Sequence, residues 1–146
     1  MRVKLDLRKL AAVERRLKKL EREKVEVGFF EEDKYEDGTP VAEVAFYNEY
    51  GTSLNPRRPF MAPLLEDKPL HAAITYNYAL AMQDAISGKG RVKKWLELIG
   101  GLMQEQIQEN IEDYPGHNSP DTIRRKGFDD PLRDTGRMHD SVKVRV

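Results

Sequence analysis

Two long stretches of helical apolar spacing, separated by a four-residue break, constrain the fold of this chain most. The spacing predicts helices over residues 67–86 and 91–113, and Ser87-Gly88-Lys89-Gly90 between them ends the first helix. Gly100-Gly101 lies inside the second helix, where each glycine costs about 1 kcal/mol relative to alanine. We therefore expect a kink or a close helix packing there. The apolar positions are Leu70, Ala73, Ile74, Tyr78 and Met82 in the first helix and Trp95, Leu98, Leu102, Ile107 and Ile111 in the second.

An amphipathic helix is predicted before these two, over residues 4–23. Leu10, Val13, Leu17 and Leu20 form its apolar stripe, and basic side chains fill the other face. Such a stripe needs a partner, which is either a sheet of the same chain or a neighbouring subunit. A basic face of this kind is either solvated or in contact with nucleic acid.

A strand over residues 24–30 and a helix ending at Tyr50 follow. Thr39 is the expected N-cap of this helix and Pro40 lies in its first turn, while Gly51 ends it. We expect Val41, Val44, Ala45 and Asn48 to face the core, with Phe46, Tyr47 and Tyr50 widening the apolar surface. In the loop 52–60, two prolines restrict the chain, Arg57 and Arg58 are held outward, and Phe60 returns to the core.

Residues 114–136 are rich in turn formers, with one helical turn expected over residues 121–126 and another after Gly136. A segment of this length is long for a loop in a compact domain, so we expect a loop that a partner orders. Alternating valines then predict a final strand over residues 142–146. Helices and strands are segregated, which favours an α+β fold: a small mixed or antiparallel sheet packed against several helices, in a single domain over residues 1–146.

The composition excludes several classes of protein. Lys plus Arg and Asp plus Glu are 25 each, so the net charge is zero and the chain is not a globally basic nucleic-acid binder. There is no cysteine, which excludes disulfides and thiolate metal sites. No apolar run reaches the ~18 residues that span a bilayer, and no apolar signal core follows the first charges. We expect no membrane contact and a cytoplasmic origin.

Charge is unevenly distributed along the chain. Residues 1–24 hold ten Lys or Arg against four Asp or Glu, which is +6, whereas residues 25–50 hold one Lys against eight Asp or Glu, which is −7. Either the two blocks lie against each other within one molecule, or the positive patch of one copy meets the negative patch of the next. The second arrangement is a heterologous contact, which closes into a ring when its rotation allows.

Few residues suggest catalysis. His117 with Asp121 is a conceivable loop metal site and His139 with Asp140 a polar pair, but neither has a known ligand spacing. A small hydrolase that uses His117 and His139 is the weakest hypothesis, and we expect neither catalysis nor a cofactor. Two basic loop clusters, Arg57-Arg58 and Arg124-Arg125-Lys126, suit phosphate or carboxylate contacts because the arginine fork is planar and bidentate. Plain solvent exposure of both clusters is the alternative.

Three stretches together resemble a known family. They are residues 41–52 running into Pro56-Arg57-Arg58-Pro59-Phe60-Met61, residues 119–127, and Pro131-Leu132-Arg133-Asp134-Thr135-Gly136-Arg137-Met138 with Ser141-Val142. In this order they resemble the tail-completion and neck proteins of tailed bacteriophages. The helix that ends in Asn48-Glu49-Tyr50-Gly51-Thr52 and the following Pro-Arg-Arg-Pro-Phe are the most specific part.

The resemblance implies a structural virion protein, assembled in the cytoplasm of a bacterial host. Such proteins form rings, commonly of six, at the head-proximal end of the tail. There they contact the tail tube protein and the head-tail connector, while DNA passes through the lumen without sequence-specific binding. Tail terminator, tail-to-head joining protein and head-side adaptor are all compatible with it. A nucleic-acid-binding adaptor that uses the N-terminal basic helix and residues 124–126 is the alternative from another class.

The resemblance also implies contact residues. The resemblance implies that Asp134-Thr135-Gly136 fixes the turn from which the last strand begins. The residues expected in subunit or neck contacts are Asn48, Glu49, Arg57, Arg58, Pro59, Phe60, Arg124, Arg125, Lys126, Asp134, Thr135 and Gly136.

Overall fold

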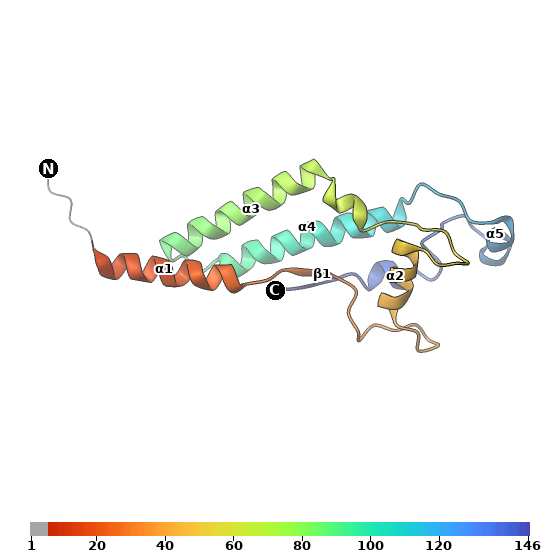
Figure 1. Ribbon diagram of the computed structural model, residues 1–146, viewed down its shortest axis with the longest axis horizontal. Helices are drawn as coiled ribbons and strands as arrows, with labels where there is room; N and C mark the ends of the chain where they lie inside the picture. The colour runs from red at the N-terminus through yellow and green to blue at the C-terminus, as the bar shows by residue number, and fades with distance from the viewer. Residues whose placement is uncertain (1–5) are drawn as a thin grey trace.

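Two long helices form the spine of the computed structural model, which describes residues 6–146 (Figure 1). They are α3, Lys68–Ser87, and α4, Val92–Glu112, and both agree with the sequence prediction. The Asp67 side chain caps α3 by accepting from the Leu70 amide at 2.8 Å. Gly88 ends α3 with φ 74, a left-handed conformation that favours glycine.

The faces by which α3 and α4 meet differ from the prediction. Tyr78, Met82 and Leu98 belong to the apolar helical spacing but are exposed. Ala81 and Ala85 are buried instead, in one cluster with Leu96 and Ile99 of α4. Alanines let two helices approach closely, so the small residues of α3 form the contact and its larger side chains remain outside.

A short antiparallel ribbon lies along α4. Strand β1, Glu26–Gly28, pairs with β2, Lys143–Arg145, so that Val27 is opposite Val144. Both strands are shorter than predicted, because pairing extends over only three residues and the chain turns after Gly28, where the Asp33 amide donates to the Phe30 carbonyl. The architecture is therefore mostly helical with a two-stranded antiparallel sheet, a form of α+β.

Gly100 of α4 explains how closely the ribbon approaches. A Cβ built on Gly100 would lie 2.3 Å from Cγ1 of Val144 and 3.2 Å from Cγ1 of Val25. The close packing expected at Gly100-Gly101 is thus present, but it is against the ribbon and involves only Gly100. Gly101 has open space where a Cβ would be.

Helix α1, Leu7–Arg22, projects beyond the turn between α3 and α4 (Figure 1). Asp6 caps it by accepting from the Arg8 and Lys9 amides, and the first residues of the predicted helix lie outside the described part of the chain. Leu20 is the only buried residue of α1, and Leu10 is 53% exposed. The apolar stripe is therefore covered at its C-terminal end and uncovered toward its N-terminal end.

Helix α2, Val41–Tyr50, begins one residue later than predicted. Its N-cap is Pro40, without a side-chain hydrogen bond, so the expected Thr39 cap is wrong. The Thr39 backbone is engaged in a preceding turn, where its carbonyl accepts from the Tyr35 amide and its amide donates to Asp37. A 3-10 turn, η1, spans Ala62–Leu65 after the loop that follows α2.

The two faces of α2 have different surroundings. Val41 and Ala45 are buried, whereas Val44 and Asn48 are half-buried. Phe46, Tyr47 and Tyr50 point to solvent rather than widening the buried surface, which corrects that expectation.

Residues 114–136 contain more regular structure than predicted. Helix α5, Pro120–Lys126, has seven residues and is capped by Ser119, whose hydroxyl accepts from the Thr122 amide. The turn after Gly136 is helix α6, Arg137–Asp140, which leads into β2.

The core has two parts. The larger lies between α2, η1, α4 and α6, and the smaller lies where α1 meets α3 and α4. The larger part contains Val41, Ala45, Phe60, Leu64, Leu70, Ile107, Ile111, Leu132, Met138 and Val142, and the smaller contains Leu20, Ala81, Ala85, Leu96 and Ile99.

The two charge blocks lie apart. Helix α1 is at one end of the long axis and α2 at the other (Figure 1). The acidic block pairs instead with β2, where Lys143 contacts Asp33 at 2.6 Å and Arg145 contacts Glu32 at 2.5 Å. Internal neutralisation of one block by the other is therefore wrong.

Candidate functional site

Two of the three segments that carry the family resemblance meet at one end of the molecule. The loop that follows α2 meets residues 131–138, where Arg58 Nη1 donates to the Pro131 carbonyl at 3.5 Å. A depression of about 290 Å³ lies between them. It is lined by residues from both segments and from α5, among them Val44, Asn48, Lys126, Leu132, Asp134 and Arg137. We call this region the motif site.

Glu49 is the organising residue of the motif site. Its buried carboxylate accepts the Phe60 amide at 2.8 Å, the Met61 amide at 2.9 Å and the Ala62 amide at 3.0 Å. Hydrogen bonds to an ionised acceptor are about twice as strong as neutral ones. Glu49 therefore fixes the return of the loop onto α2, and its carboxylate is not available to a partner.

The backbone of the loop is tied to α2 as well. The Arg58 amide donates to the Asn48 carbonyl at 2.7 Å, and Arg57 Nε donates to the Glu49 carbonyl at 3.1 Å. Gly51 has φ 77, and a Cβ on it would lie 2.9 Å from the Arg57 nitrogen. The Asn48 side chain donates to the Val44 carbonyl within α2. The end of α2 thus holds the following loop against itself through the backbone carbonyls of Asn48 and Glu49.

Phe60 anchors the loop in the core. It has no exposed surface, its ring packs edge-on against Phe29 at 5.9 Å, and its carbonyl accepts from Asn110 at 2.9 Å. The expected return of Phe60 to the core is confirmed. As a buried side chain, it shapes the surface without forming part of it.

The basic cluster of α5 divides into two kinds of residue. Arg124 and Arg125 are exposed, and Arg124 pairs with Asp121 in the preceding turn. Lys126 turns inward, where its ammonium donates to the carbonyls of Asp130 and Arg133 and lies 4.9 Å from the Phe128 ring centroid. Burial lowers the Lys126 pKa, with the carboxylates of Asp134 and Asp130 opposing that shift.

Asp134-Thr135-Gly136 forms the turn before α6. Gly136 adopts φ 80 as the N-cap of α6, and the Thr135 hydroxyl accepts from the Arg137 amide at 3.3 Å. The turn launches α6 directly and β2 only after it. Burial and then the Asp134 carboxylate raise the pKa of Tyr35, which lines the same depression.

The structure therefore brings all the expected contact residues to one end but separates their roles. Glu49 and Phe60 are internal, and Asn48 and Gly136 serve the local backbone. Three of the others are half-buried, namely Arg58, Pro59 and Lys126. The remaining five are exposed to solvent, namely Arg57, Arg124, Arg125, Asp134 and Thr135.

His117 and His139 each contact a different aspartate. His117 Nδ1 lies 2.7 Å from Asp129, while Asp121 pairs with Arg124, so His117 and Asp121 are not partners. His139 contacts its neighbour Asp140 at 2.8 Å. Within residues 6–146, no three His, Asp or Glu side chains gather into a metal-binding group.

Two features at the surface were missed from the sequence. The first is an outward face of α2 formed by Glu43, Phe46, Tyr47 and Tyr50, which we call the aromatic face. Phe46 is 57% exposed and Tyr50 is 64% exposed, with their ring centroids 4.8 Å apart. The apolar residues on both sides of α2 could have predicted this face, because only one side of the helix can pack on the core.

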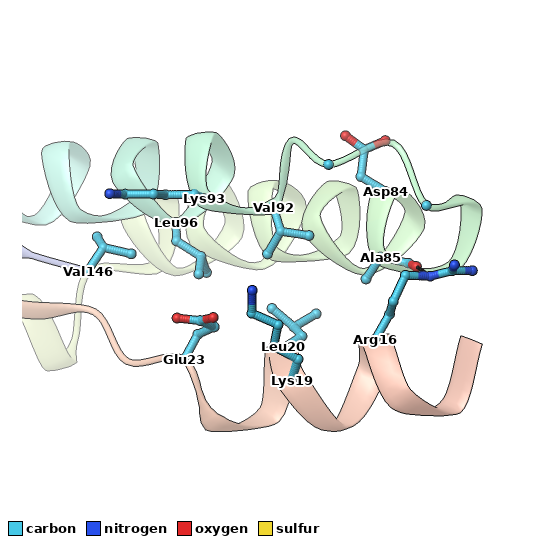
Figure 2. Close-up of a pocket in the computed structure, with 12 residues that line it drawn as sticks. Arg16, Lys19, Leu20, Glu23, Asp84, Ala85, Val92, Lys93, Leu96 and Val146 are labelled. Atoms are coloured by element: carbon cyan, nitrogen blue, oxygen red, sulfur yellow. Dashed lines mark hydrogen bonds between the residues drawn. The ribbon is translucent and has the colours of Figure 1, made fainter. Parts of the chain in front are cut away.

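The second feature is a cavity of about 460 Å³ beneath α1, which we call the α1 cavity. Figure 2 shows Leu20 of α1 pointing into it from one side and Val92 and Leu96 of α4 from the other. Arg16 closes one end by donating to the Ala85 carbonyl at 2.6 Å and to the Ile86 carbonyl at 2.8 Å.

Asp84 stabilises the helical turn beside this cavity. Its buried carboxylate accepts two hydrogen bonds from Arg91, at 2.9 and 3.1 Å, and one from the Trp95 indole at 2.8 Å. These hydrogen bonds, from Arg91 first and Trp95 second, hold the Asp84 pKa below its ordinary value. The position of this aspartate on the apolar face of a helix could have predicted a buried carboxylate with hydrogen-bond partners.

No helix in residues 6–146 combines the length and apolar character that crossing a membrane requires. Comparison of the chain with protein-family models, with curated proteins and with solved structures finds no significant match.

Proposed function

We propose that this chain is a non-catalytic structural subunit of a tailed bacteriophage. It assembles with copies of itself into a ring, of six subunits in the usual case, at the head-proximal end of the tail. The ring completes the tail tube and joins it to the head-tail connector.

The observation that carries this proposal is the convergence of the two resembling segments. The contact between Arg58 and Pro131 joins positions 73 residues apart, and both segments line one depression. Segments that resemble one family and also form one site behave as a functional unit. The exposed fork of Arg57 and those of Arg124 and Arg125 suit carboxylate contacts on a neighbouring protein.

The charge distribution supports a ring. The basic helix α1 lies at the opposite end from α2 (Figure 1), so the two ends of one molecule differ, which favours contacts between different surfaces of successive copies, the geometry of closed rings. A net charge of zero suits a conduit through which DNA must slide without being held. Ordering of residues 114–136 by the neighbouring virion protein belongs to this proposal, since α5 lies at the outer end of the molecule (Figure 1) and its Arg124 and Arg125 are exposed.

The position in the particle tests the proposal. Phage particles that carry this chain are labelled with gold-conjugated antibody and imaged by negative-stain electron microscopy. We expect gold at the junction of head and tail. Labelling of the tail tip, labelling of the capsid lattice or complete absence of the chain from purified particles contradicts the proposal.

The basic face of α1 favours a second candidate, a nucleic-acid-binding adaptor. Lys9, Arg15 and Lys19 are exposed on a helix that projects from the body. Phosphate contacts of this kind weaken steeply with salt. A shift of DNA mobility at low salt that disappears with added salt and with Arg15→Glu supports this candidate, and no shift at low salt removes it.

A further inference from the structure

The aromatic face of α2 is an interaction surface on geometric grounds. Glu43, Phe46, Tyr47 and Tyr50 follow i, i+3, i+4, i+7 spacing, so they share one side of the helix. The Tyr47 hydroxyl donates to Glu43 at 2.8 Å, and Phe46 stacks in a tilted arrangement on Tyr50. The face is therefore a structured patch of neighbouring side chains.

Helix α2 has apolar residues on both sides. Its inner side buries Val41 and Ala45 in the core, while two of the largest side chains on its outer side are more than half exposed. A helix that is apolar all round is normally buried all round. Contiguous exposed aromatic groups are characteristic of protein contacts, because aromatic residues are enriched in interfaces. A partner that covers the outer side completes the burial of α2.

The α1 cavity has the complementary properties. Its walls are apolar, formed by Leu20, Ala85, Val92 and Leu96, and its rim carries Lys19 and Lys93 together with Glu23. Figure 2 shows the Lys19 ammonium turned into the opening between α1 and α4. Among residues 6–146, no carboxylate lies within 4.0 Å of this ammonium.

One charged residue of each surface bears on the contact. Glu43 on the aromatic face contacts only the Tyr47 hydroxyl and no Lys or Arg within the described residues. Glu43 beside the aromatic rings and Lys19 at the apolar cavity thus have opposite charges, and opposite charges favour and orient such a contact.

We propose that a second copy of this chain inserts Phe46 and Tyr50 into the α1 cavity, with Glu43 of that copy beside Lys19. This rests on the proposed self-assembly and identifies the surfaces that carry it. Because the two surfaces differ and lie at opposite ends, each copy offers one of each, and the chain of contacts closes into a ring when the rotation per subunit permits.

The uncovered part of α1 extends the contact. A wholly buried aromatic side chain covers roughly 150–250 Å², and only 57% of Phe46 and 64% of Tyr50 remains to be covered. The two rings therefore supply far less than the ~800 Å² per partner of a standard interface. The apolar stripe of α1 continues from Leu20 in the cavity to Leu10 and to Leu7, which is 68% exposed. Covering these leucines in the same contact supplies further apolar area.

Cross-linking between two single-cysteine variants tests the contact, because the chain itself contains no cysteine. Full-length Tyr50→Cys and Lys19→Cys are prepared separately, mixed in equal amounts and treated with a short bismaleimide. Both positions are exposed, so neither change disturbs the core. We expect a covalent dimer in the mixture and at most a trace, under one tenth as much, in either variant alone.

Tyr76→Cys mixed with Lys19→Cys is the matched control. Tyr76 is a tyrosine with 66% exposure, close to the 64% of Tyr50, but it lies on α3. We expect no more dimer from this control than from single variants. Equal yields from Tyr76 and Tyr50 overturn the inference, as does a Tyr50→Cys variant that cross-links efficiently to itself.

Light scattering on the unmodified chain separates the two proposals. If the chain is oligomeric but the two cysteine variants give no cross-linked product, the ring proposal stands and the assignment of the contact to the aromatic face and the α1 cavity is overturned. A chain that is monomeric at all concentrations contradicts self-assembly itself. If Tyr50→Cys cross-links to Lys19→Cys but the protein is absent from the head-tail junction, the proposed contact is supported and the proposed neck function is contradicted.

Discussion

The two ends of this molecule are stabilised in different ways. At the α2 end, ten buried apolar residues form the larger core, and Glu49 binds three backbone amides of the returning loop. At the α1 end, five buried residues form the smaller core, and α1 contributes only Leu20 to it. A fixed end and a loosely held end suit a subunit that keeps one surface constant and adapts another when it assembles.

The largest expected effect is at the fixed end. Phe60→Ala removes a fully buried ring from the larger core and should lower the free energy of unfolding by about 3–5 kcal/mol. Urea denaturation followed by circular dichroism measures it. Tyr50→Ala, an exposed position next to the same loop, is the control and should change stability by about 0.5 kcal/mol or less. Similar losses for both would show that the loop is not anchored through Phe60.

The apolar stripe of α1 gives the next effect and compares covered with uncovered positions. Leu20→Ala should cost about 2–5 kcal/mol because Leu20 is buried. Leu10→Ala, the same substitution on the same stripe, should cost about 0.5 kcal/mol or less in the monomer because Leu10 is exposed. Equal costs in urea denaturation of dilute protein would mean that the whole stripe is covered within one molecule.

Glu49→Gln tests the carboxylate that ties the loop to α2. The amide keeps one acceptor oxygen for three backbone amides, so at least one buried N–H loses its partner, at a cost of about 1–3 kcal/mol. Hydrogen exchange should become faster at the amides of Phe60, Met61 and Ala62. Unchanged exchange at these three amides contradicts the role assigned to Glu49.

The neighbouring glycines of α4 give the smallest effects, with opposite signs. Gly100→Ala forces a Cβ against Val144 and should destabilise by about 1–3 kcal/mol. Gly101→Ala meets open space and should stabilise by up to about 1 kcal/mol through helix propensity. Thermal unfolding of the two variants checks the order, and a stabilising Gly100→Ala would show that the ribbon does not pack on α4.

Local sequence patterns were sufficient to predict the two long helices, the end of α2 and the return of Phe60 to the core. Periodic apolar residues located α3 and α4, Gly51 marked the end of α2, and the prolines around Arg57 and Arg58 indicated a constrained loop that returns at Phe60. These features depend on residues near each other along the chain.

Features that depend on distant residues were not predictable. Periodicity gives the apolar positions of α2 but not which side the rest of the chain covers, so its exposed aromatic face was missed. Glu49 is one residue of the Asn-Glu-Tyr-Gly segment that ends α2, yet its partners are amides 11 to 13 residues later that only the folded loop presents. The contact between Gly100 and Val144 likewise joins segments that no local pattern relates.

The mass of the full-length chain in solution tests the central claim most directly. Size-exclusion chromatography with light scattering, over a series of concentrations with and without tail tubes, measures it. Self-assembly through the two ends predicts a discrete species at a multiple of 16.9 kDa. A 16.9 kDa species at every concentration, in both the presence and the absence of tail tubes, would contradict the account.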